Sequence, residues 1–107
     1  MSPTDLLFLY ITCPTKELAL TLSERAIHGK MAACANIHGP ITSLYPWEGK
    51  IQQDTEWVLI LKTAHTQVDS LTEFIEKEHP YQIPCILQMP IVGGNASYMQ
   101  WLLDQMA

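Results

Sequence analysis

The sequence predicts an α+β fold in which two helices pack on one face of an antiparallel sheet. Three observations lead to this prediction. One apolar run near the start has the composition of a strand that is buried on both faces, two later stretches alternate between apolar and polar residues, and two segments repeat apolar residues at helical spacing. A chain of 107 residues is expected to hold one hydrophobic core, so residues 1–107 are interpreted as a single domain.

The first strand and first helix follow from the opening third of the chain. Residues 6–11, LLFLYI, form a continuous apolar run of strand formers, which predicts a central strand. Leu18, Leu22 and Ala26 then recur at helical spacing. Gly29 supplies the stop, because glycine is the usual residue just past a helix end.

A long hairpin is predicted next. Residues 31–47 alternate for much of their length, with a bend or bulge at residues 39–40, Gly-Pro. Residues 46–49, PWEG, form the turn, and residues 50–63 return as the second strand. The outer half of this hairpin, about residues 43–54, has too few partners within one small domain, so it is expected to pair with a neighbouring subunit.

The remaining segments complete the pattern. Residues 66–69 resemble a helix-opening cap, and the second helix is expected to end near Glu78. Residues 84–89 are predicted to form a short strand, and Asn95 is predicted to cap a third helix. That helix is apolar enough to require a docking surface. Its apolar residues are Tyr98, Met99, Trp101, Leu102 and Met106.

This order of elements is that of a ferredoxin-like sandwich with an extra C-terminal helix. Two helices cover one face of the sheet and leave the other face bare. The best cover for a bare apolar sheet face is the same face of other copies, with help from the terminal helix. The sequence therefore predicts a homo-oligomer.

Charge and composition exclude several classes of function. Six basic residues against eleven acidic ones give a net charge of -5, which provides no basic surface for nucleic acid. The run at residues 6–11 is too short to span a bilayer, and no charged segment of a secretion signal precedes it, so no membrane partner is expected. Three widely spaced cysteines favour reduced thiols, and hence a cytoplasmic location.

Sulfur and imidazole make a metal site the sharpest chemical hypothesis. Three cysteines and four histidines are ligands that suit copper or zinc. Cys34 and His38 share a strand face, but they lie about 13 Å apart at about 3.3 Å per residue and cannot hold one ion together. Cys13 ends the first strand, and residues 78–79 end the second helix. Both can therefore reach the sheet margin, where a neighbouring subunit would complete a site. The alternatives are a core thiol for Cys34 and simple exposure for the others.

Signatures of catalysis are absent from the sequence. It contains no G-x-S-x-G, no phosphate-binding G-x-x-x-x-G-K-[ST] and no G-x-G-x-x-G. Asp54 and Glu56 are interpreted as solvating the edge of the hairpin rather than as an acid and base pair. The chain is therefore not expected to be an enzyme.

Aromatic residues gather in the turns and near the C-terminus. Tyr45, Trp47, Tyr81 and Trp101 are suited either to a ligand pocket or to packing in a core or interface, and packing is the preferred interpretation. A tryptophan at the tip of a hairpin is costly to expose, so Trp47 is expected to insert into an adjacent subunit.

Four stretches stand in an order that resembles the CutA divalent-cation tolerance family. They are AACAN at residues 32–36, SLYPWEGK at 43–50, HPYQIP at 79–84 and PIVGGN at 90–95. The resemblance runs from about Phe8 to Leu103. It implies a ferredoxin-like fold assembled as a homotrimer similar to the P-II signalling proteins. It also implies a cytoplasmic protein linked to tolerance of copper and other divalent cations, with no established enzymatic activity.

The resemblance also implies a ligand set. Copper-binding members are taken to use a first-strand cysteine and two adjacent histidines before the P-Y motif. Here the first-strand position is Ile11, with Cys13 two residues later on the same face, and Glu78 and His79 occupy the two histidine positions. Cys34 matches the A-C-x-N segment. The implied copper ligands are therefore Cys13, His79 and either Glu78 or Cys34.

Three interpretations remain open at this point, one of which is that stability of the trimer is itself the main selected property. The first is a trimeric tolerance protein that binds copper or another divalent metal ion. The alternative is a P-II-like signalling or scaffold module that binds a small anion or nucleotide in clefts between subunits. Such binding is expected to depend on Lys50 or Lys62.

Overall fold

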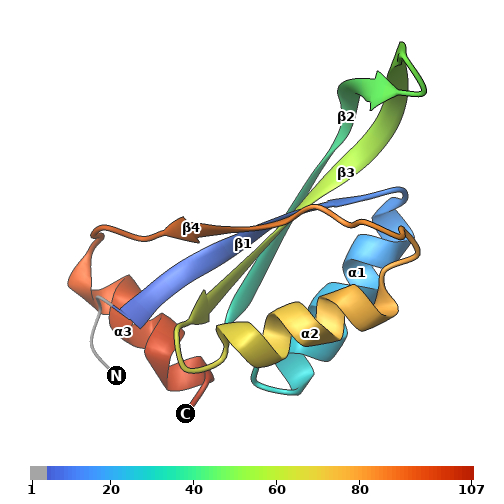
Figure 1. Ribbon diagram of the computed structural model, residues 1–107. Helices are drawn as coiled ribbons and strands as arrows, with labels where there is room; N and C mark the ends of the chain where they lie inside the picture. Colours follow the sequence, from blue (N-terminus) through green and yellow to red (C-terminus); the bar gives the residue numbers. More distant parts are fainter. Residues whose placement is uncertain (1–4) are drawn as a thin grey trace.

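A computed structural model describes residues 5–107, so residues 1–4 of the predicted domain lie outside it. Seven elements follow one another along the chain (Figure 1). They are β1 (Leu6–Cys13), α1 (Lys16–His28), β2 (Cys34–Trp47), β3 (Lys50–Ala64), α2 (Val68–Glu78), β4 (Ile86–Pro90) and α3 (Ala96–Gln105).

The four strands form one antiparallel sheet in the order β2-β3-β1-β4. β1 lies between β3 and β4, which confirms that the apolar run is central. Figure 1 shows α1 and α2 side by side against one face of this sheet. Leu9, Ile11 and Leu61 are fully buried in the core between the sheet and these helices, where each contributes about 2 kcal/mol. The predicted α+β sandwich is confirmed.

The C-terminal helix α3 packs on the opposite face. Successive side chains of a strand point to opposite faces of the sheet. Leu6 and Ala64 therefore point to the face opposite α1 and α2. They join Met99, Leu102 and Met106 in a second buried cluster. α3 therefore covers one end of the face that α1 and α2 leave bare, as expected from its apolar composition.

The β2–β3 hairpin extends far beyond the rest of the molecule (Figure 1). Its register shifts between His38 and Ile41, which confirms the predicted bend at residues 39–40. Gly39 has a φ of +155° there, and a side chain at this position would meet the ring of Trp57. The molecule consequently measures 46 × 25 × 21 Å, and the tip of the hairpin makes no layer with the helices.

Three elements start at a different residue from the predicted one. β2 begins at Cys34 rather than Met31, because the backbone N–H groups of Met31 and Ala32 donate to the carbonyl of Ala26 and so complete the end of α1. β4 begins at Ile86 rather than at residue 84, a proline, which has no N–H for the sheet.

The third difference concerns the start of α2. The helix begins at Val68 with Gln67 as its N-cap residue, and the side chain of Gln67 makes no capping hydrogen bond. In α3, Asn95 stands at the predicted N-cap position, but its side chain donates to the hydroxyl of Ser97 instead of accepting from the helix backbone. No helix in the described part of the chain is both long and apolar enough to cross a membrane.

Candidate functional site

The two cysteines proposed as metal ligands lie on opposite faces of the sheet. Cys13 is fully buried in the core beneath α1 and α2. Cys34 is half-buried and packs against the cluster around α3, with its Sγ 3.7 Å from the hydroxyl of Tyr98. The sheet therefore separates these thiols, and one ion cannot bind both.

His79 is buried and uses both ring nitrogens within the chain. Its Nε2 lies 2.8 Å from the carbonyl oxygen of Thr12, and its Nδ1 lies 3.2 Å from the backbone N of Tyr81. A carbonyl can only accept and a backbone N–H can only donate, so the ring is the tautomer with its proton on Nε2. Neither nitrogen then has a free lone pair for a metal. His79 instead ties the segment after α2 to the end of β1.

The side chain of Glu78 points to α1, whereas His79 contacts Thr12 in β1. Oε1 of Glu78 lies 3.0 Å from Nη2 of Arg25, and the guanidinium of Arg25 also lies 5.0 Å from the ring centre of Phe74. The pair is largely exposed, so it stabilises the protein by less than about 1 kcal/mol. Within residues 5–107, no three His, Cys, Asp or Glu side chains gather closely enough to hold a metal ion.

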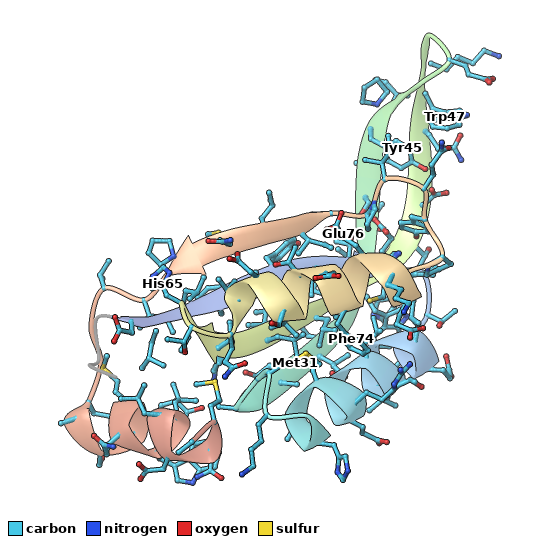
Figure 2. All side chains as sticks on the ribbon, turned by 60° about the horizontal axis from the view of Figure 1, so that its bottom comes forward. Met31, Tyr45, Trp47, His65, Phe74 and Glu76 are labelled. Atoms are coloured by element: carbon cyan, nitrogen blue, oxygen red, sulfur yellow. The ribbon has the colours of Figure 1, made fainter. Side chains whose placement is uncertain are left out.

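A cavity of about 450 Å³ lies elsewhere, between the outer hairpin and the segment that joins α2 to β4. Figure 2 shows Tyr45 and Trp47 on the projecting part of the hairpin beside that segment. The volume is within the range of small-molecule sites. Its lining includes Tyr45, Trp47, Asp54, Glu56, Tyr81 and Ile83.

Two tyrosines donate hydrogen bonds to the two carboxylates of this cavity. The hydroxyl of Tyr81 lies 3.0 Å from Oε2 of Glu56, and the hydroxyl of Tyr45 donates to Oδ2 of Asp54. The Tyr45 bond holds the pKa of Asp54 below its usual value, and a weaker bond from Gln52 acts the same way. Burial, followed by the bond to Glu56, raises the pKa of Tyr81. The cavity therefore presents ionised Asp54 and protonated phenols at neutral pH.

Glu56 was not recognisable from the sequence as a site residue. The expectation that it solvates the hairpin edge is wrong, because only 7% of its surface is exposed. Asp54 and Glu56 share one face of β3, as their spacing of two predicts. The segment that covers them is more than twenty residues away, so only the fold places Tyr81 against Glu56. The one usable signal was the set of aromatic residues in the turns.

The buried thiol of Cys13 allows a test by pH. Burial, followed by the nearby charge of Glu56, raises its pKa from 9.0 to about 11. The folded protein keeps this proton where the unfolded chain releases it. The contribution of this protonated thiol to the free energy of unfolding is therefore complete below about pH 9. It is lost as the pH rises to about 11, and the free energy of unfolding falls by at most about 1.4 kcal/mol per pH unit in that range.

We expect the free energy of unfolding to fall more steeply between pH 9 and 11 for the wild type than for Cys13→Ala. Urea denaturation at each pH measures this slope. Leu20→Ala, which removes an exposed apolar side chain and no thiol, is the control and is expected to keep the wild-type slope. Equal slopes for the wild type and Cys13→Ala would show that the thiol is not protected by burial.

Comparison with known proteins gives a consistent family. The family model of the CutA1 divalent ion tolerance protein matches residues 7–105. The chloroplastic CutA 1 of Oryza sativa subsp. japonica is 45% identical over 94 residues, which cover 88% of this chain and 53% of that protein. The divalent-cation tolerance protein CutA of Thermus thermophilus is 38% identical over 94 residues, 88% of this chain and 91% of that protein.

Relatives differ in length and in the location that their names give. This chain covers 63% of a CutA homolog from Xenopus laevis, so it spans between about half and two thirds of these longer relatives. The rice protein is named as chloroplastic, whereas a solved relative from Archaeoglobus fulgidus is named as periplasmic. The names of relatives therefore do not fix one compartment.

Solved structures agree with the sequence relatives. The divalent ion tolerance protein CutA1 from Ehrlichia chaffeensis is 39% identical, with a TM-score of 0.93 over 99% of both chains. CutA1 from Oryza sativa is 41% identical, with a TM-score of 0.93 over 99% of this chain and 98% of the other. Family model, sequence relatives and fold agree over nearly the whole chain, and the protein belongs to the CutA1 divalent ion tolerance family.

Proposed function

We propose that this chain acts as a homotrimer that binds divalent metal ions, copper among them, in metal tolerance. The apolar surface that a single chain leaves uncovered carries the proposal for assembly. Leu44 is 64% exposed and Ile51 is 77% exposed on the hairpin, and Leu87 is 57% exposed on β4. Large apolar side chains left exposed to this extent are typical of a protein interface.

The sheet also offers backbone for assembly. β2 and β4 are its two edge strands, and the outer half of β2 and β3 projects away from the body (Figure 1). A projecting two-stranded ribbon is marginally stable alone. A neighbouring chain that pairs with this ribbon would satisfy the edge and cover Leu44 and Ile51, which share one face of the ribbon.

Assembly is tested by the mass of the protein in solution. We expect wild-type protein to sediment at three times the mass of one chain at micromolar concentration, and Trp47→Ala to dissociate there, because a buried interfacial tryptophan commonly contributes about 2 kcal/mol or more. Leu20→Ala removes an exposed apolar side chain from α1 and is the matched control. A single-chain mass for the wild type would contradict the trimer.

The second part of the proposal is that the assembled protein binds metal ions. The family and the soft donors of the chain support it, with Cys13, Cys34, Glu78 and His79 as candidate ligands. Because a single described chain holds no converging set, an ion would need donors from a second chain or a rearranged segment. Cys34, which is half-buried beside α3, is more accessible than the fully buried Cys13.

Titration of reduced protein with Cu(I) and Zn(II) against a competing chelator tests this part. We expect stoichiometric binding by the trimer, weakened at least tenfold in Cys34→Ser, since a thiolate ligand is replaced by a poor one. Cys13→Ser gives the comparison for a buried thiol. Failure of the wild type to compete with the chelator for either metal would refute metal binding without affecting the trimer.

Location and partners are inferred from the net charge and the free thiols. Three free cysteines are typical of a reducing compartment, which supports a cytoplasmic location. A net charge of -5 weighs against nucleic acid as a partner. The proposal includes no catalysis, because no hydrogen bond among the described residues joins a cysteine thiol to a histidine.

A further inference from the structure

The cavity beside the hairpin has a polar wall that lies deep and an apolar rim. Glu56, at 7% exposed, forms part of the inner wall, and Tyr81 covers it from the segment after α2. Trp47 and Ile83 are 59% and 88% exposed and stand at the rim. This arrangement of apolar walls with a few convergent polar groups is characteristic of a small-molecule site.

The charge of the cavity is negative and has no internal counter-charge. Asp54 and Glu56 both line it, whereas no lysine or arginine among residues 5–107 does. Each carboxylate receives hydrogen bonds only from neutral groups, Tyr45 and Gln52 on Asp54 and Tyr81 on Glu56. A nearly buried carboxylate without a cationic partner is costly, so a cation from outside would stabilise this site. An anion or nucleotide would be repelled.

The size and lining distinguish an organic cation from a metal ion. A cavity of about 450 Å³ is much larger than one ion needs. Cys85 also lines it, but no three His, Cys, Asp or Glu side chains among the described residues gather closely enough to hold a metal ion. The rings of Tyr45, Trp47 and Tyr81 line the space instead. Aromatic faces attract ammonium groups, by about 0.5–2 kcal/mol each depending on exposure.

The spacing of the carboxylates favours two ammonium groups. Asp54 and Glu56 lie two residues apart on one face of β3, which places their Cα atoms about 7 Å apart. A short aliphatic diamine spans a comparable length. Its methylene chain would lie against the aromatic rings, and each end would meet one carboxylate.

We propose that the cavity lined by Tyr45, Asp54, Glu56 and Tyr81 binds a small aliphatic diamine. One ammonium group pairs with Glu56 at the inner wall, and the other pairs with Asp54 nearer the tip of the hairpin. Ile83, at the rim of the cavity, lies over the methylene chain between them. The site requires no metal ion, so it stands or falls separately from metal binding.

Calorimetric titration of the reduced protein with 1,4-diaminobutane, in the presence of EDTA, tests the proposal. We expect saturable binding that is at least tenfold tighter than for 1-aminobutane, with no binding of 1-butanol. Glu56→Gln keeps an acceptor for Tyr81 and is expected to weaken diamine binding at least tenfold, as is Asp54→Asn. Glu73→Gln removes the same charge from an exposed position of α2 and is expected to leave binding unchanged.

Sedimentation of each variant accompanies the titration, so a lost trimer is not mistaken for a lost site. Absence of saturable diamine binding to correctly assembled wild-type protein would overturn the proposal. A neighbouring chain that filled the cavity would give this result. Equal weakening by Glu56→Gln and Glu73→Gln would also overturn it, because the effect would then reflect net charge alone. Competition by ATP at the same site would do the same.

Discussion

His79→Ala is expected to lower the free energy of unfolding by about 2–3 kcal/mol. The substitution removes both hydrogen bonds of the ring and leaves the carbonyl of Thr12 and the N–H of Tyr81 without their partner. It also empties a space that is nearly buried, since His79 is 7% exposed. Urea denaturation at neutral pH, without added metal, measures the loss.

The same variant bears on the metal hypothesis. His65→Ala, at an exposed position, is the matched control and is expected to change stability by less than about 0.5 kcal/mol. If His79→Ala is as stable as the wild type without metal, the hydrogen bonds of the ring contribute little and the ring is free to serve as a ligand. Loss of metal binding in a strongly destabilised His79→Ala protein would not identify a ligand.

Gly39→Ala is expected to destabilise the protein by about 3 kcal/mol. A Cβ at this position would lie 2.9 Å from Cε3 of Trp57 and 3.2 Å from the carbonyl oxygen of Glu56. The φ of +155° is also a conformation that residues with side chains rarely adopt. Because the bend directs the outer hairpin, we expect Gly39→Ala to weaken trimer formation as well.

Substitutions at two other glycines distinguish the cost of backbone strain from the cost of steric overlap between a new Cβ and its neighbours. Gly49 has a φ of +76° with no atom near its position for a Cβ, so Gly49→Ala is expected to cost about 1 kcal/mol from conformation alone. Gly93 also has open space and serves as the neutral control. Thermal denaturation of the three variants gives the comparison. A Gly39→Ala loss no larger than that of Gly49→Ala would mean that Trp57 moves aside freely.

The spacing of apolar residues and the positions of glycine and proline were enough to predict the fold. The apolar run at residues 6–11 allowed only a doubly buried strand, and β1 is central. The residue pair 39–40 marked the hairpin bend, where the register shifts. The boundaries at Met31 and Thr66 were misplaced because backbone hydrogen bonds at helix ends, which no side-chain pattern records, decide them.

The candidate site was less accessible to sequence reasoning. Cysteine and histidine indicate metal chemistry by type alone, but burial protonates Cys13 and hydrogen bonds occupy His79. The ligand set of Cys13, Glu78, His79 and Cys34 stays a prediction for the assembled protein. Conversely, Glu56 gained its place in a cavity from a contact with Tyr81 that joins distant segments. Such contacts follow from tertiary packing, not from local pattern.

The central place of β1 determines when this sheet can form during synthesis. Leu7, near the start of the chain, lies opposite Thr63 on one side and Pro90 on the other. Within this sheet, β1 leaves the ribosome before the other strands and is paired on both edges only after β4 has emerged. Closing such long loops costs entropy before any contact offsets it, which slows folding. A nascent chain that ends before β4 would expose one edge of its most apolar strand, the segment most in need of protection from aggregation.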